Sequence, residues 1–525
     1  MEPNEEATSS RSISRSAWVA LLLIVIAGAW LRAHRIGDRS LWYDEGATYW
    51  FAAQSWHDLW GPAARLETSP PLYYSLQKSW LVFGESPAAL RSLPALFGVL
   101  TIFAAFALGR TSCGTAAGLM TAAIAGCSAV HIHYSQEART YSWLVLLLTI
   151  ALWALAHLFM HPSQASQPLL PFASKRFAPH GSSPRSAAFA WAAYVLAIIA
   201  AIYSHNTAVL FPLLATAAAT VFWMMAARRN AGFALNWVVV HLVILVAYSW
   251  WLPTLLWQAQ HYTDTYWRGA WTPALTWDHF KNVVLQVYGA GHDSRLSMLA
   301  ALALPGLAIL GVPALRKRPP VLALLLIIAA GLPLLAAGLS FWRPVFGARF
   351  LLWGTVPLFA LSAAGASWLR PRWLGYSAIA LVLAVQLVSV RSYYASEGID
   401  GWDEAAAYVK QHERTGDVLL FANNVADAAF RYYYRPEDGI APRYALEWAE
   451  RRDPDRLRPA HAALPEIHLD DLAKSLGAYR RIWYISRWPP EQVAPPEALM
   501  RLARVAGVKV FRGDIHVRLL VPQSM

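Results

Sequence analysis

The sequence predicts an α-helical protein that crosses a membrane about eleven times and ends in a small soluble α/β domain. Hydrophobic residues make up 57% of the chain and charged residues only 14%, whereas soluble proteins carry about 25% charged residues. Up to residue 390, apolar stretches recur at close to the length of about 20 residues that spans a bilayer as a helix. Beyond residue 390, short apolar strands alternate with helical patterns, which is typical of an α/β domain.

Charge and cysteine content narrow the class of protein further. The net charge is +12 at pH 7, which basic loops beside anionic lipid explain, and no nucleic-acid-binding motif accompanies it. The 26 Trp and 22 Tyr residues suit the aromatic belts at membrane–water interfaces. Cys113 and Cys127 have neither the spacing of a metal site nor the number for a disulfide framework. We therefore expect membrane lipids, and no nucleic acid, among the partners.

The membrane domain is predicted over residues 17–390. Residues 1–16, rich in Ser and Arg, predict a disordered cytoplasmic tail. The first span, 17–31, lacks a small-residue cleavage site before Arg32, so we expect it to be retained rather than removed as a signal peptide. An unusually long external loop, 32–87, follows it. The later spans are predicted at 88–109, 114–131, 142–160, 188–204, 206–226, 233–253, 297–314, 320–340, 350–369 and 373–390.

The loops on the two sides of the predicted membrane differ in charge. Five loops on one side carry Lys or Arg and no Asp or Glu, among them the loops with Arg228 and Arg316, and acidic residues gather in the opposite loops. Basic loops usually face the cytoplasm. Arg32, Arg35 and Arg39, just after the first span, argue for the reverse, but five later loops outweigh them. The acidic loops, and the C-terminus after an odd number of spans, are therefore predicted to be external.

Residues 391–525 are predicted to form the external α/β domain. A helix is expected at 403–412 and strands at 417–421 and 481–486. Two further strands, 508–511 and 515–521, flank a hairpin-like turn. Two roles are open for this domain: it could bind a substrate or only cover the site.

The first external loop carries two adjacent carboxylates, Asp44 and Glu45, within the stretch Ser-Leu-Trp-Tyr-Asp-Glu-Gly-Ala. Charges at the edge of a bilayer are costly to desolvate and usually mark a site. Their aromatic, apolar surroundings favour a raised pKa and the role of a general base. Glu67 follows in the same loop, and Tyr73 and Tyr74 come after a di-proline that suits the start of a helix. The alternative is an ordinary re-entrant loop with solvated carboxylates.

Two later external turns also carry polar groups. The turn His-Ile-His-Tyr-Ser-Gln-Glu-Ala-Arg-Thr-Tyr places Tyr134, Glu137 and Arg139 between two spans. Glu137 and Arg139 could instead simply pair with each other at the interface. The two histidines of this turn lack the i, i+4 spacing of a helical metal pair. His205, in the next turn, suits a structural hydrogen bond as well as it suits contact with a ligand.

Two external arginines, Arg343 and Arg349, stand where a late span begins. A guanidinium group binds phosphate through a permanently charged, bidentate fork. Snorkelling to lipid headgroups is the alternative for either residue alone.

In their order along the chain, the motifs Tyr-Asp-Glu-Gly, Ser-Pro-Pro-Leu-Tyr-Tyr, Tyr-Ser-Gln-Glu-Ala-Arg-Thr-Tyr and Ala-Arg-Phe-Leu-Leu resemble those of the GT-C glycosyltransferases. Within that superfamily the chain is similar to the bacterial family-39-like branch, which is related to protein O-mannosyltransferases and to the aminoarabinose transferase of lipid A. The resemblance covers about residues 17–390. It implies a GT-C catalytic domain in the bacterial cytoplasmic (inner) membrane, with the active site and the C-terminal domain on the periplasmic side.

The resemblance also implies roles for the candidate residues. Asp44 resembles the family's first-loop catalytic aspartate, with Glu45 beside it, and Arg349 resembles the arginine that meets the donor phosphate. Further candidates for the phosphate are Arg343, Arg139 and Lys78, the last from its charge alone. The supporting or substrate-binding candidates are Glu67, Tyr73, Tyr74, Tyr134, Glu137 and His205.

Metal binding in the first loop is left open by these patterns. Relatives often have His immediately before the di-proline, where this chain has Ser69, and that difference argues against metal ligation in this loop. A divalent metal beside Asp44 and Glu45 is still compatible with the resemblance. No other cofactor is expected.

The activity that the resemblance implies is transfer of a sugar from a polyprenyl-phosphate donor to a hydroxyl or amine of a glycan, lipid or protein acceptor. Asp44 would act as the base, and a single displacement would invert the anomeric centre. Two alternatives remain: a lipid or polysaccharide transporter (flippase), and a non-catalytic GT-C-like scaffold. A transporter would carry ionisable residues near the middle of broken helices, whereas these spans are nearly free of charge.

Overall fold

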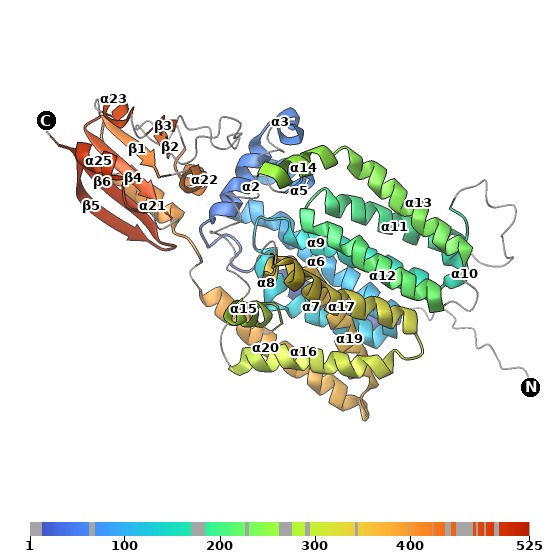
Figure 1. Cartoon of the computed structure of the whole chain (residues 1–525). Helices are drawn as coiled ribbons and strands as arrows, with labels where there is room; N and C mark the ends of the chain where they lie inside the picture. The colour runs from blue at the N-terminus through green and yellow to red at the C-terminus, as the bar shows by residue number, and fades with distance from the viewer. Residues whose placement is uncertain are drawn as a thin grey trace, which may run out of the picture.

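The structure, a computed structural model, contains a bundle of long helices and a smaller sheet-containing domain at one end of it (Figure 1). It describes residues 13–61, 69–169, 184–225, 230–261, 276–288, 295–341, 345–396, 398–422, 424–435, 443–447, 466–468, 471–476, 479–487 and 493–523.

The bundle consists of apolar helices joined by short turns. Its long helices are α1 (Arg15–Ala33), α6 (Pro87–Cys113), α7 (Thr115–Cys127), α9 (Tyr141–Met160), α11 (Pro184–Ile202), α12 (Leu210–Met225), α13 (Ala231–Ser249), α16 (Arg295–Ala314), α17 (Pro319–Leu339), α19 (Thr355–Trp368) and α20 (Arg372–Ala395). Shorter helices of this part are α8 (Ala129–Ser135), α10 (Pro162–Ala165), η3 (Asn206–Val209), α14 (Leu252–His261), α15 (Trp277–Tyr288), α18 (Ala348–Leu351) and η4 (Leu352–Gly354).

Among the described residues, eight helices are long and apolar enough to cross a membrane, or nine if α7 and α8 form one bent span. Two shorter apolar helices cover Ser186–Ile202 and Ala301–Ala314. Each of the eleven predicted spans overlaps one of these helices or the bent pair. The predicted fold class, a polytopic helical membrane protein with a small C-terminal α/β domain, is confirmed.

The bend of 58° between α7 and α8 is stabilised by polar side chains from two other helices. A broken helix leaves backbone groups without intrahelical partners, and these must be satisfied when they are buried. The fully buried guanidinium of Arg32 donates to the carbonyls of Ala125 and Gly126 at 3.1 and 3.0 Å. Gln386 of α20 accepts from the backbone N–H of Ala129 at 3.0 Å. The break therefore turns the chain without unpaired polar groups at these positions.

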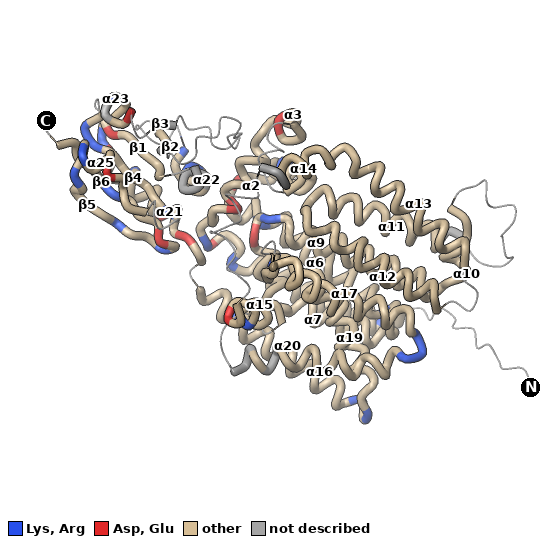
Figure 2. Tube along the Cα trace, viewed as in Figure 1, with Lys and Arg blue, Asp and Glu red and all other residues tan. Residues whose placement is uncertain are grey.

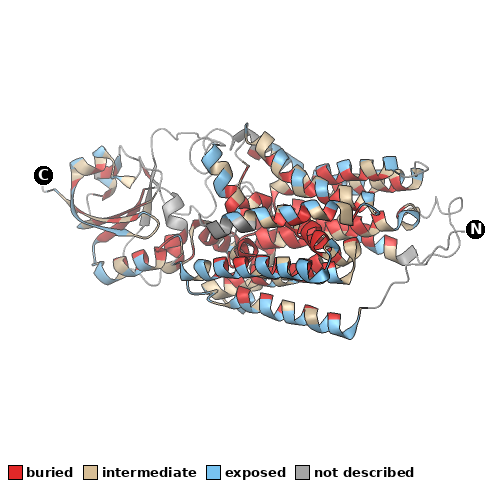
Figure 3. Cartoon of the chain, turned by 90° about the horizontal axis from the view of Figure 1, so that it is seen from below, coloured by how far each residue is buried: buried red, intermediate tan, exposed pale blue. Residues whose placement is uncertain are grey.

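Burial follows the pattern expected of a bundle in lipid. Buried residues fill its interior, and exposed residues line the outer faces of the peripheral helices (Figure 3). Many of the exposed side chains are large and apolar, among them Leu22 and Leu23 of α1 and Val246 of α13. Inside, small residues bring helices close: a Cβ at Gly365 of α19 would lie 1.9 Å from the carbonyl oxygen of Leu307 of α16.

The C-terminal domain is a six-stranded mixed sheet with helices against it. Its strands run in the order β3-β2-β1-β4-β6-β5, of which β1, β2, β3 and β4 are parallel and β5 and β6 form an antiparallel hairpin. The strands are β1 (Asp417–Phe421), β2 (Arg443–Glu447), β3 (Glu466–His468), β4 (Arg481–Ser486), β5 (Ala503–Phe511) and β6 (Ile515–Pro522). Its helices are α21 (Trp402–His412), α22 (Asn424–Tyr433), α23 (Leu472–Leu476) and α25 (Glu497–Leu502). Apolar clusters on both faces of the sheet form its core.

The first loop contains α2 (Tyr43–Ala53), α3 (Trp56–Trp60), α5 (Leu72–Trp80) and η1 (Leu81–Phe83). Its helices α2, α3 and α5 lie at the end of the bundle nearer the C-terminal domain (Figure 1). Basic loops between α16 and α17 and between α19 and α20 lie at the opposite end of the bundle, whereas acidic residues gather near α2 (Figure 2). The fold therefore places the acidic loop and the C-terminal domain at one end and two of the basic loops at the other.

Candidate active site

Asp44 lies in the first turn of α2, facing two arginines from distant parts of the chain. Its Oδ2 is 3.6 Å from Nη1 of Arg349, on α18, and 3.8 Å from Nε of Arg139, in the turn between α8 and α9. These distances are those of an ion pair but are too long for hydrogen bonds. Within the described part of the chain, the Asp44 carboxylate makes no hydrogen bond, although its side chain is only 16% exposed. It is therefore enclosed, held near positive charge, and free to accept a proton.

Glu45, the next residue, is bound on every side. Nε and Nη2 of Arg91 on α6 donate to its two oxygens at 2.7 and 2.6 Å. The backbone N–H groups of Ala138 and Trp42 donate to the same carboxylate at 2.8 and 3.3 Å. The side chain is 1% exposed. A buried bidentate pair of this kind fixes geometry, so Glu45 ties the first loop to α6 and to the second turn.

The second turn, between α8 and α9, contributes two charged residues. Arg139 forms the ion pair with Asp44, and Glu137 is a buried acid that faces a different group. Nη1 of Arg139 donates to the hydroxyls of Tyr74 and Thr48 at 3.3 and 3.4 Å, which directs its guanidinium toward α2 and α5. The Glu137 carboxylate lies 3.9 Å from Nε2 of His133. Burial, with Glu45 and Asp44 nearby, raises the pKa of the Glu137 carboxyl to about 8. Glu137 can therefore hold a proton at neutral pH.

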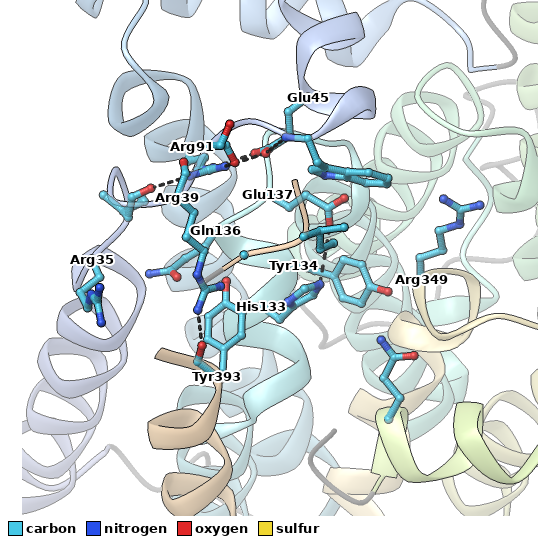
Figure 4. A pocket seen from close by; sticks show the side chains of 16 residues that line it. Arg35, Arg39, Glu45, Arg91, His133, Tyr134, Gln136, Glu137, Arg349 and Tyr393 are labelled. Carbon is cyan, nitrogen blue, oxygen red and sulfur yellow. Dashed lines mark hydrogen bonds and ion pairs between the residues drawn. The ribbon is translucent and has the colours of Figure 1, made fainter. Parts of the chain in front are cut away.

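A cavity of about 240 Å³ lies beside Glu45, Arg91 and the second turn (Figure 4). Its wall includes Glu137, Tyr134 and His133 from the second turn, together with Arg349. The remaining polar lining comes from Arg35, Arg39, Ser40, Glu45, Arg91, Gln136, Gln286 and Tyr393. Asp44 is not among the lining residues, although its neighbour Glu45 and its ion-pair partner Arg349 are. Such a mixture of basic and hydrogen-bonding groups suits an anionic, polar ligand.

The sequence and the fold were compared with those of known proteins. The model of the family described as dolichyl-phosphate-mannose-protein mannosyltransferase matches residues 68–169. The crystal structure of apo ArnT from Cupriavidus metallidurans is 14% identical, covers 96% of this chain and 98% of its own, and superposes with a TM-score of 0.64. This chain has the GT-C fold. The predicted resemblance to the GT-C membrane glycosyltransferases is confirmed.

Two further GT-C structures are similar. ArnT of the same organism, bound to undecaprenyl phosphate, has 14% identity, the same coverage of 96% and 98%, and a TM-score of 0.58. The Archaeoglobus fulgidus oligosaccharyltransferase, tethered with an acceptor peptide, has 12% identity over 90% of this chain and 69% of its own, with a TM-score of 0.55. No curated protein sequence matches the chain.

Three other predicted site residues, Tyr73, Tyr74 and His205, are buried. Tyr74 meets Arg139, and Tyr73 is buried behind it with its hydroxyl 3.4 Å from Gln77. His205 is buried, and its Nδ1 accepts from the backbone N–H of Thr207 at 3.1 Å. Burial lowers the pKa of His205 to about 3, so its ring is neutral.

Lys78 is held away from Asp44. Its ammonium group donates to the backbone carbonyls of Gln54 and Ala52, at the end of α2, at 2.6 and 3.4 Å. Cations at the C-terminal end of a helix satisfy carbonyls left without partners. The geometry thus gives Lys78 a role in ending α2. Glu67 and Arg343 lie outside the described residues.

The sequence patterns do not single out Arg91, although it holds Glu45. The one available signal is a charged residue in the first turns of the otherwise apolar span 88–109. Charged residues within spans are rare and usually paired or functional. Arg32 has the same signal, since it lies in the last turn of α1 and is buried.

The two adjacent carboxylates do not converge on a metal position. Both oxygens of Glu45 are occupied by Arg91. Within the ranges that the structure describes, no group of three or more His, Cys, Asp or Glu side chains could hold a metal ion. The described residues around Asp44 therefore do not form a metal site.

Proposed function

We propose that this protein is an integral membrane glycosyltransferase. It would move a sugar from a polyprenyl-phosphate donor to a hydroxyl or amine of a glycan, lipid or protein acceptor on the external side of a bacterial cytoplasmic membrane. The single observation that carries this proposal is the enclosed Asp44 carboxylate, which lies 3.6 Å from Arg349 and makes no hydrogen bond to any residue that the structure describes.

The chemistry follows from this arrangement. The acceptor oxygen or nitrogen attacks the anomeric carbon, and Asp44 takes the proton that the acceptor loses. The bond between the anomeric carbon and the phosphate oxygen breaks, and the phosphate leaves with the electron pair. Arg349 stabilises the negative charge that grows on the departing phosphate, and such stabilisation is strong in a site with little water. Because attack and departure occur on opposite faces, the anomeric centre inverts.

Two features of neighbouring proteins support the choice of substrates. A structural neighbour with the same fold is bound to undecaprenyl phosphate, and another carries an acceptor peptide. The external location is supported by the basic loops after α16 and α19, which lie at the end of the bundle remote from α2 (Figure 2).

The experiment compares Asp44→Asn with a matched control, Asp58→Asn, in the same external loop. Asp58 is an acidic residue of α3 that forms a local pair with Ser55 at 2.7 Å. Each variant is expressed in a strain that lacks the native gene, and envelope glycans, lipids and glycoproteins are analysed by mass spectrometry. We expect a mass increment of one sugar with wild type and Asp58→Asn, and at least about 10²-fold less with Asp44→Asn, because a general base contributes that much. A wild-type yield from Asp44→Asn would refute the proposal.

A further inference from the structure

The segment that carries Asp44 is fixed by the C-terminal part of the chain. We propose that Asp400 and Tyr433 are positioning residues that hold the start of α2, and with it Asp44, in place. This inference rests on the proposed function for its catalytic consequence, but its structural part can be tested separately.

Three consecutive backbone N–H groups precede Asp44, and each faces a different side chain. The N–H of Leu41 donates to the hydroxyl of Tyr433, on α22, at 2.7 Å. The N–H of Trp42 donates to Glu45 within the same turn. The N–H of Tyr43 faces the carboxylate of Asp400. The first N–H groups of a helix have no intrahelical partners, so these bonds determine where α2 starts.

Asp400 is itself held rigidly within the C-terminal domain. Nη2 of Arg487 donates to its Oδ1 at 2.6 Å, and the indole N–H of Trp402 donates to its Oδ2 at 3.0 Å. Nε of Arg487 also donates to the carbonyl of Gly513 at 3.0 Å. Gly513 has φ +81°, and a Cβ there would lie 2.5 Å from Oδ1 of Asp400. The β5–β6 turn therefore closes tightly over this carboxylate.

A second set of contacts joins α22 to the first loop. Tyr432 packs edge-on against Tyr49 of α2, with ring centroids 5.1 Å apart, and its hydroxyl donates to the carbonyl of Glu85. Arg435 pairs with the Glu85 carboxylate at 2.8 Å. The C-terminal domain thus contacts the catalytic loop both before and after Asp44.

These contacts matter because displacement of a catalytic group by about 1 Å can cost about 10²-fold in rate. The contacts with the bundle hold the first turn of α2 through the pair of Glu45 with Arg91. The C-terminal contacts hold the helix from its N-terminal end. The role of the domain is therefore the placement of the base, which differs from binding the acceptor or merely covering the site.

The chain provides a closely matched control, Asp417. It is a buried aspartate of the same domain, bound by Arg481 at 2.6 Å and by the indole N–H of Trp483 at 2.9 Å. Like Asp400, it is bound by one arginine and one tryptophan. Unlike Asp400, it lies in the sheet, and its partners are on β4.

The test measures hydrogen–deuterium exchange by mass spectrometry on the full-length protein in lipid nanodiscs. Asp400→Asn and Tyr433→Phe are each expected to raise deuterium uptake severalfold in the peptide spanning residues 40–50. Asp417→Asn is expected to leave that peptide unchanged. Unchanged uptake with both test variants, or an equal rise with Asp417→Asn, would overturn the inference.

Sugar transfer provides the second readout. Asp400→Asn and Tyr433→Phe are expected to lower kcat about ten-fold or more with little change in KM, since they displace the base and do not touch substrate. Raised exchange with an unchanged kcat would also overturn the positioning role. A wild-type protein that transfers no sugar, with exchange behaving as expected, would refute the proposed function and leave the placement of α2 by Asp400 standing.

Discussion

Asp44 and Glu45 are adjacent in sequence, yet their carboxylates are in opposite physical situations. Glu45 accepts from a guanidinium and two backbone N–H groups, and moving it would leave the Arg91 charge buried and unpaired. Among the described residues, Asp44 makes long ion pairs with Arg349 and Arg139 and no hydrogen bond through its carboxylate. A general base needs a free lone pair, so only Asp44 is suited to that task, and Glu45 is suited to positioning it.

Glu137 gives a pH-dependent prediction at the residue scale. Its pKa is raised from 4.5 to about 8 in the folded protein by burial. Because the unfolded chain releases this proton at lower pH, the stability linked to Glu137 is complete below about pH 4.5 and is lost as pH rises toward 8. We expect the melting temperature of wild type in detergent to fall more steeply between pH 5 and about pH 8 than that of Glu137→Gln. Glu497→Gln, at an exposed position, is the control, and an identical slope for Glu137→Gln and wild type would contradict this account.

The sequence motifs identified the charged side chains that meet at the site. They did not identify the residues that hold the start of α2 in place. Asp44, Arg139 and Arg349 stand in recognisable patterns, and the structure brings them within ion-pair distance. Asp400 and Tyr433 stand in no motif, because their importance lies in the backbone groups that they face, which are more than 300 positions away in the sequence. A pattern of side chains cannot reveal a partner that is a backbone N–H.

At the scale of elements, Arg91 joins the first loop to the bundle. Arg91 lies in the first turns of α6. Besides pairing with Glu45, its guanidinium donates to the carbonyls of Ile36, Arg39 and Ser40 at 2.9 to 3.1 Å. One side chain therefore satisfies several carbonyls of the segment that leads into α2. The first loop has little regular structure before α2, so these bonds define its path.

We predict that Arg91→Ala destabilises the protein by about 3–5 kcal/mol, the cost of leaving one member of a buried ion pair alone. The first loop should become sensitive to protease in the folded protein. Thermal unfolding and limited proteolysis in detergent measure both effects. Arg372→Ala, at the exposed first position of α20, should change neither, and a wild-type melting temperature for Arg91→Ala would show that the pair does not hold the loop.

Hydrophobic runs predicted the spans well and the irregular elements less well. The bend between α7 and α8 depends on Arg32 and Gln386, which lie outside that segment, so periodicity within 114–131 could not predict it. In the C-terminal domain, strands were expected at 417–421 and 481–486, where β1 and β4 lie. The short strands β2 and β3 carry little periodic signal of their own, because three to five residues are too few.

At the scale of the whole molecule, charge and fold agree on two distinct ends. The C-terminal domain and the acidic first loop lie at one end, and the basic loops that follow α16 and α19 lie at the other (Figure 2). Since basic loops favour the cytoplasm, the site is expected to open to the external side.

Single-cysteine labelling in spheroplasts tests this orientation. In a background in which Cys113 and Cys127 are replaced by Ser, Lys509→Cys on β5 should react with a membrane-impermeant maleimide. Arg316→Cys, in the loop after α16, should react only after the membrane is made permeable. Labelling of Arg316→Cys alone in intact spheroplasts would invert the assigned orientation.

The central claim is that Arg349, opposite Asp44, binds the phosphate of a polyprenyl-phosphate donor. Its most direct test is the affinity of the purified protein for undecaprenyl phosphate, measured by native mass spectrometry for wild type, Arg349→Ala and the remote control Arg316→Ala. Loss of a charged hydrogen bond costs about 1.5–3 kcal/mol, so we predict that Kd rises about 10- to 150-fold for Arg349→Ala and not for Arg316→Ala. Equal affinity for wild type and Arg349→Ala would contradict the account.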